Sequence, residues 1–185
     1  MKHLTTEQLK SGLSHIQNSP KDDGVVELIV CRPEENQREV LAQGVLDLEV
    51  GLVGDNWKTR GSSRTTDGFG HPHMQLNIMN SRAIQLIAQE KNRWKLAGDQ
   101  LFVDLDLSAE NLPIGTKLSI GTAIIQITEI PHLGCKKFVE RFGLDAMKFV
   151  NSTIGKSLNL RGVNAKVIKQ GIITIGDKIR KTLSN

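Results

Sequence analysis

The sequence contains no tyrosine and only two tryptophans and five phenylalanines among its 185 residues. Proteins that bind single-stranded nucleic acid stack bases on aromatic side chains, so this scarcity argues against that class of function. The net charge of +4 is mild, whereas nucleic-acid interfaces usually show a clustered basic excess. We therefore expect no nucleic-acid partner, and we expect the basic bias to serve a small anionic ligand.

Long apolar runs are also lacking, and none approaches the length of about 20 residues that a membrane span requires. The first eight residues have no apolar segment typical of a secretory signal. The only cysteines, Cys31 and Cys135, are too few for a disulfide framework. We expect a cytoplasmic protein with reduced thiols and no membrane contact, and its length suits one domain.

Short strands at close spacing dominate the rest of the pattern. Between them the sequence lacks the regular helices that a Rossmann-type sheet requires. We therefore predict a mainly β fold, a β-barrel or a sandwich, with peripheral α-helices. Two segments with a short apolar strand between glycines, 115–121 and 171–176, predict similar hairpin turns. The predicted strands cover residues 25–30, 45–50, 75–79, 101–107, 123–130 and 165–168. In the first of them we expect Val26, Leu28 and Val30 to share one face.

The N-terminal segment shows the spacing of a capping box at Thr5–Gln8. Leu9, Leu13 and Ile16 follow on one helical face, and Pro20 ends the segment. We predict a helical extension over residues 1–20 and a barrel domain over residues 21–185. The alternative is a disordered tail, since chain termini are often loose.

The pattern of apolar residues changes from a strand to a helix around Cys135. Pro131 ends a β-branched run because it lacks a donor N–H. After Cys135, Phe138 and Phe142 are spaced as on one helical face. The pattern therefore predicts that Cys135 lies where a strand ends and a helix begins.

Positive charge near this position would favour a thiolate at Cys135. A helix N-terminus carries about half a positive charge, and Lys136 and Lys137 add two more. A thiolate attacks electrophiles, carries sulfur and binds soft metals. The alternative is a small core residue, which is the role that we expect for Cys31 within its strand.

Several basic and polar residues are candidates for binding an anion near Cys135. Arg161, Arg64 and Lys136 could pair with phosphate oxygens, and Gly162 could allow close backbone approach. The alternative for each cation is a solvated surface charge.

The polar stretch from Asn56 to His73 is long enough to be functional or disordered. His71 and His73, with His132, could ligate a metal, but zinc sites require defined spacing and further ligands. We expect these histidines to orient a ligand or cap a loop. Asp55 follows Gly54, and we expect its side chain to fix the turn.

Four segments in order resemble the MOSC domain, named for the C-terminal part of molybdenum cofactor sulfurase. The resemblance extends from about Gly24 to the end of the chain. The segments are Gly51–Asp55, Asn111–Gly121, the single Cys135 after a strand, and Arg161–Asp177.

The resemblance implies a closed barrel in which Cys135 carries a persulfide or ligates molybdenum in a pterin cofactor. It also implies molybdenum ion and pyridoxal phosphate binding. The sequence departs from reductase-like relatives, which carry His-Gly-Gly where residues 70–73 read Gly-His-Pro-His, and it lacks their additional N-terminal barrel half. The implied cofactor-binding residues are Arg161, Lys136, Arg64, Asn111, His73 and Asp55.

Two classes of function follow. The first is a reductase or sulfur carrier that acts through Cys135, together with a sulfur donor or an electron-transfer protein. The second is a binding module of the same fold that holds a cofactor or partner without chemistry. A homodimer is compatible with both classes. The reactivity of Cys135 discriminates between them.

Overall fold

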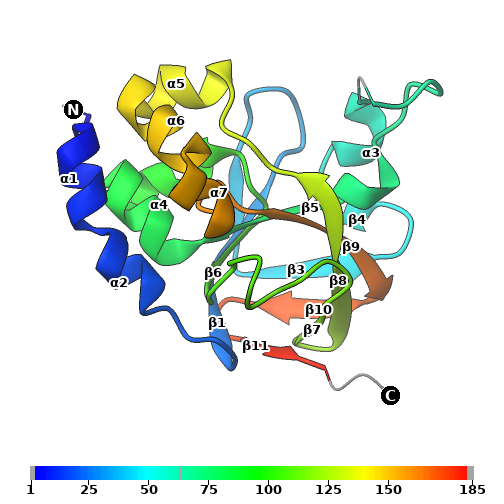
Figure 1. Ribbon diagram of the computed structural model, residues 1–185. Helices are drawn as coiled ribbons and strands as arrows, with labels where there is room; N and C mark the ends of the chain where they lie inside the picture. The colour runs from blue at the N-terminus through cyan, green and yellow to red at the C-terminus, as the bar shows by residue number, and fades with distance from the viewer. Residues whose placement is uncertain (1–2, 63, 183–185) are drawn as a thin grey trace.

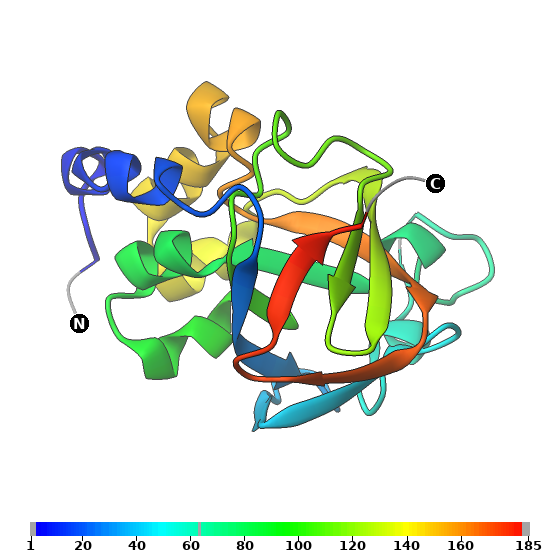
Figure 2. The same cartoon turned by 90° about the horizontal axis from the view of Figure 1, so that it is seen from below.

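The computed structural model describes residues 3–62 and 64–182. Strands β11, β7, β8, β9, β5, β6 and β1 are hydrogen-bonded in this order, and pairing of β11 with β1 closes the barrel (Figures 1 and 2). The closed β-barrel that we predicted is thus confirmed. The strands are β1 (Gly24–Cys31), β2 (Glu39–Leu41), β3 (Gln43–Asp47), β4 (Gly51–Leu52), β5 (Leu76–Asn80), β6 (Leu101–Asp104), β7 (Lys117–Ile120), β8 (Ala123–Pro131), β9 (Val163–Lys169), β10 (Gly171–Thr174) and β11 (Lys178–Lys181).

Most helices gather on one side of the barrel, whereas α3 lies apart from them (Figure 1). The barrel is mixed, because β5 and β6 are parallel and are joined through α4 and η2. No helix in the described ranges is both long and apolar enough to cross a membrane. The helices are α1 (Thr6–Ser11), α2 (Leu13–Gln17), α3 (Trp57–Arg60), η1 (Pro72–Met74), α4 (Ser81–Ala88), η2 (Lys91–Ala97), α5 (Lys136–Phe142), α6 (Leu144–Asn151) and α7 (Thr153–Ser157).

Two hydrophobic cores result from this arrangement. One fills the barrel, and the other lies between the helices and the outer face of β1, β5 and β6. A register shift between Val26 and Leu28 places Val26 in the barrel core and Leu28 with Val30 in the helical core. Our assignment of these three residues to one face was therefore wrong, because a bulge changes the alternation of side chains.

Two strand predictions also differ from the structure. β3 ends at Asp47, whose carboxylate accepts hydrogen bonds from the backbone N–H groups of Glu49 and Val50. This side-chain turn stops the strand that we predicted over residues 45–50. β7 and β8 form the expected hairpin, but β10 pairs with β3 while β11 pairs with β7 and β1.

The N-terminal helices pack on the helical core. The capping box at Thr5 and Gln8 is present in both directions. Leu9 and Ile16 are 1% and 5% exposed and belong to the core shared with the other helices. These contacts attach residues 3–20 to the barrel through the helical layer, and the division into an extension and a barrel domain stays a prediction.

Candidate functional site

Cys135 lies between β8 and α5, as the change in periodicity predicted. It is the N-cap residue of α5, and its side chain is exposed. Phe138 and Phe142, each 1% exposed, anchor α5 in the helical core. No hydrogen bond from the described residues reaches the sulfur atom of Cys135. The fold therefore presents a thiol to solvent at a fixed helix start.

The loop before Cys135 is held by α6. Asn151 accepts a hydrogen bond from the N–H of Gly134 at 2.9 Å and donates one to its carbonyl at 3.0 Å. A Cβ atom at position 134 would lie 3.0 Å from Val150 and 3.3 Å from Met147. Glycine therefore allows the close approach to α6 that positions the Cys135 loop.

Arg161 lies in a buried cluster beneath this loop. Its Nη1 atom donates to Asp99 at 2.6 Å and its Nη2 atom to the carbonyl of Ala97 at 2.9 Å. Its guanidinium carbon lies 5.0 Å from the centroid of the Phe138 ring. These contacts join the barrel to α5. Because Arg161 is only 6% exposed, it is not a solvated surface charge.

His132 completes this cluster. Its Nδ1 atom lies 3.3 Å from the second carboxylate oxygen of Asp99. Burial raises the pKa of Asp99, an effect that the Arg161 guanidinium opposes. Burial and the positive charges of Arg161 and Arg32 lower the pKa of His132 well below its usual value. The neutral imidazole is thus the favoured form in the folded protein.

A second buried cluster centres on Arg32 and Asp55. The carboxylate accepts from Nε and Nη2 of Arg32, each at 2.8 Å, and the side chains are 3% and 0% exposed. Asp55 also accepts from the N–H of Trp57 at 2.9 Å, so our prediction that it fixes its turn is confirmed. Nη1 of Arg32 donates to Gly98 and Asn77.

Hydrogen bonds connect this ion pair to the end of β8. Asn77 donates to Asn164 at 2.6 Å, and Asn164 donates to the carbonyl of Ile130 at 2.8 Å. The segment that contains Gly98 and Asp99 joins the Arg32 and Arg161 clusters. The buried polar groups therefore form a continuous support for the strand end that leads to Cys135.

Sequence reasoning missed Arg32 and Asp99 as members of the site. Arg32 directly follows β1, and Asp99 lies two residues before β6. The available signal was a charged residue at the end of an apolar strand. A charge that is buried at such a position requires a partner of opposite charge.

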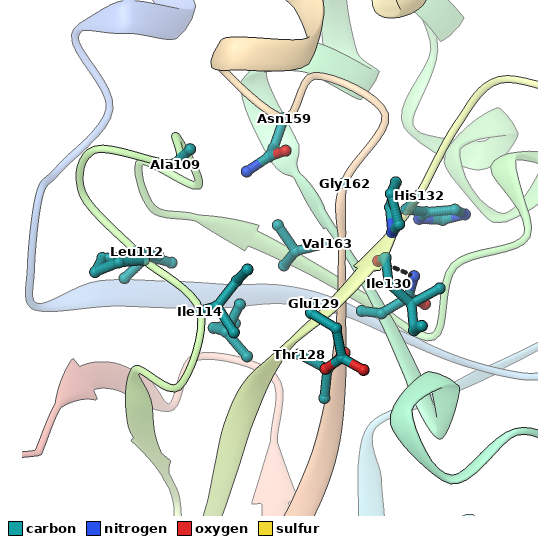
Figure 3. Close-up of a pocket in the computed structure, with 14 residues that line it drawn as sticks. Ala109, Leu112, Ile114, Thr128, Glu129, Ile130, His132, Asn159, Gly162 and Val163 are labelled. Atoms are coloured by element: carbon teal, nitrogen blue, oxygen red, sulfur yellow. Dashed lines mark hydrogen bonds between the residues drawn. The ribbon is translucent and has the colours of Figure 1, made fainter.

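An apolar groove runs along β8 beside this polar support, and Asn164 belongs to both. One cavity of about 380 Å³ runs along β8 between the 109–114 loop and residues 159–164, with Glu129 and His132 among its lining residues (Figure 3). A second cavity, of about 330 Å³, shares Pro131, His132 and Asn159 with it. Cys135 lines neither cavity, and His132 and Asn159 are the polar residues common to both.

The other predicted site residues are dispersed. Lys136 is exposed beside Cys135, and Arg64 is exposed on the loop after α3. Asn111 donates to the carbonyls of Lys21 and Asp106 and accepts from Lys181. His73 contacts Glu129 at 2.8 Å, and this hydrogen bond lowers the pKa of Glu129. The structure thus gathers only Arg161 and Lys136 around the Cys135 loop.

A family comparison agrees with this arrangement. Residues 65–180, more than half of the chain, match the MOSC domain. The protein belongs to the MOSC domain family. This family is linked to molybdenum cofactor-related proteins. The matched segment includes Asp99, His132 and Cys135, whereas Arg32 and Asp55 precede it.

Solved structures share this MOSC fold. The YuaD protein from Bacillus subtilis has a TM-score of 0.60 at 15% identity, with 87% of this chain and 97% of that chain covered. YiiM from Escherichia coli has a TM-score of 0.57 at 18% identity, with coverage of 87% and 71%. A crystal structure of a hypothetical protein has a TM-score of 0.57 at 21% identity, with coverage of 86% and 69%. No curated protein matches the sequence.

The buried ion pair predicts a large effect of Asp55→Asn. Asparagine keeps the size of the side chain but leaves the Arg32 charge without its counterion, so the free energy of unfolding should fall by about 3–5 kcal/mol. Urea denaturation at pH 7.5 measures this change. Asp23→Asn is the matched control, because Asp23 pairs with Arg180 on the surface and should cost less than about 1 kcal/mol. Equal losses would contradict the structural role of the buried pair.

The lowered pKa of His132 predicts a pH dependence of stability. Unfolded His132 titrates near its ordinary pKa of about 6.5. Because the folded protein lowers this pKa, the unfolded state binds more protons below pH 6.5, and stability falls as the pH falls. The slope contributed by one such proton reaches at most about 1.4 kcal/mol per pH unit.

Urea denaturation of wild type and His132→Gln at pH 7.5 and 5.5 tests this dependence. The variant should lose less stability than the wild type over this interval, because it lacks the titrating group. His15→Gln is the control, since His15 is exposed, and it should behave as the wild type. If His132→Gln keeps the full wild-type slope, the account of His132 is wrong.

Proposed function

We propose that this MOSC protein acts in molybdenum cofactor-linked chemistry through Cys135, whose thiolate serves as a ligand of molybdenum in a pterin cofactor. The observation that carries this proposal is the exposed thiol of Cys135 on a loop that Asn151 holds in place. Thiolate sulfur is soft and polarisable, which suits this metal. Both the family and the chemistry of the Cys135 thiolate therefore support a molybdenum ligand at this position.

The residues around Cys135 fit this role. Lys136 supplies an exposed cation next to the thiol, and the buried Nε atom of Arg161 lacks a described partner. Arg161 acts as a positioning residue, since it joins Asp99 to Phe138 of α5. Asp55 acts indirectly, because its partner Arg32 is linked through Asn77 and Asn164 to the end of β8. When bound, a molybdenum pterin cofactor supplies redox chemistry. The chain supplies the thiolate ligand, the neighbouring positive charge and a fixed loop.

Sulfur transfer is the second candidate, and the solvent exposure of Cys135 favours it. The Cys135 thiolate would attack the outer sulfur of a persulfide on a donor protein. A new S–S bond would form at Cys135 while the S–S bond of the donor breaks, and the donor would leave as a thiolate. This step requires no external oxidant, and an exposed thiol is accessible to a protein donor.

The different surroundings of the two cysteines predict different reactivity. Cys31 is 4% exposed, and burial together with the Asp55 carboxylate raises its pKa. Cys135 is exposed, so iodoacetamide at pH 7.5 should alkylate it about tenfold faster or more. Mass spectrometry of the two cysteine peptides measures both rates. The rates should converge in denaturant, and equal rates in the native protein would remove the reactive role of Cys135.

An activity comparison tests the proposed function. Protein from a host that makes the cofactor should reduce an N-hydroxylated substrate with a suitable electron donor, and Cys135→Ala should abolish this activity. A sulfur carrier should instead gain the mass of one sulfur atom on Cys135 after incubation with a cysteine desulfurase and cysteine. Full activity in Cys135→Ala would contradict both candidates, and absence of both behaviours in the wild type would favour a non-catalytic binding module.

A further inference from the structure

A cationic pocket lies beside the Cys135 helix. The loop between β1 and β2 forms one wall and rises next to α5 (Figure 1), while α3 and the first turn of α5 complete it. The cavity has a volume of about 320 Å³. Its lining residues are Arg32, Glu34, Glu35, Asn36, Arg38, Asn56, Arg60 and Lys137.

Two arginines in the cationic pocket lack a compensating charge. Asp55 neutralises Arg32, and Glu35 lies 3.1 Å from Lys137. Neither Arg38 nor Arg60 forms an ion pair with another described residue. Arg141 adds positive charge near Arg38, whereas Glu34 is exposed at the rim and accepts a hydrogen bond from Gln37. Five cations in and around the pocket therefore face three carboxylates.

The hydrogen-bonding capacity of these arginines is also unused. The Nε atom of Arg38 is buried without a partner, and its Nη1 atom donates only to the adjacent carbonyl of Gln37. The side chain of Arg60 makes no hydrogen bond within the described residues. Burial and the charges of Arg141, Arg32 and Arg60 lower the pKa of Arg38. An anion would remove both the repulsion and the unsatisfied donor.

We infer that the cationic pocket binds a phosphate group, either as the free ion or as a monoester, with Arg38 and Arg60 as its principal ligands. Guanidinium groups present paired donors that match phosphate oxygens. Lys137 is two residues from Cys135, which places their Cα atoms within about 7 Å. A phosphate in the pocket would therefore lie near the reactive thiol. Which molecule carries this phosphate rests on the proposed function.

Isothermal titration calorimetry of the full chain in a chloride buffer tests this assignment. Inorganic phosphate and glycerol 3-phosphate are the two probes, and the tighter one identifies the free ion or the monoester as the preferred form. The wild type should show saturable binding with one site. Arg38→Gln and Arg60→Gln should each weaken it about tenfold or more, because each removes a charge-assisted contact. Arg180→Gln, which removes an exposed arginine on β11, should leave it unchanged.

The assignment is overturned if the wild type shows no saturable binding of either probe, or if Arg180→Gln weakens binding as much as the pocket variants. Arg60 is exposed, so Arg60→Gln keeps the test valid if Arg38→Gln fails to fold. Cys135→Ala should bind phosphate with wild-type affinity. A wild type that shows the Cys135-dependent activity but binds no phosphate would reject the pocket alone. A wild type that binds phosphate in the pocket but shows no Cys135-dependent activity would reject the proposed function alone.

Discussion

The buried ion pair between Arg32 and Asp55 is the constraint on which the rest of the site depends. Removing two charges from water costs several kcal/mol for each ion, and this cost is offset only when the remaining donors and acceptors find partners. The side chain of Arg32 achieves this through Asp55, Asn77 and Gly98. The hydrogen bonds continue from Asn77 through Asn164 to the end of β8. The geometry of the Cys135 loop is therefore linked to the hydrogen bonds that stabilise the buried ion pair.

The same physical requirement explains which cations are available to a ligand. Arg161 is committed to Asp99 and the backbone of Ala97, so it stabilises the junction between the barrel and α5. Arg38 and Arg60 lack such partners and face a solvent-accessible cavity. The fold thus divides its basic residues into a buried group that holds the Cys135 loop and a second group that can meet an anion. Both groups lie near the exposed thiol.

The strands and the place of Cys135 could be predicted from local patterns, whereas the choice of a closed barrel over a sandwich rested on the resemblance to the MOSC domain. Short alternating runs specify strands, and the break between Pro131 and Phe138 specifies a strand end before a helix. The role of Arg161 could not be predicted in this way, since its partner Asp99 lies 62 positions away. The bulge beside Leu28 and the turn at Asp47 likewise depend on tertiary pairing or on one side-chain hydrogen bond, which periodicity does not reveal.

We propose that the Cys135 thiolate holds molybdenum in this MOSC protein. The most direct measurement is the molybdenum and pterin content of wild type and Cys135→Ser purified from a host that makes the cofactor, with thermal unfolding as a check that both are folded. Molybdenum and pterin should copurify with the wild type, and the serine variant should lose the metal. Equal molybdenum in the two proteins, or none in the wild type, would contradict it.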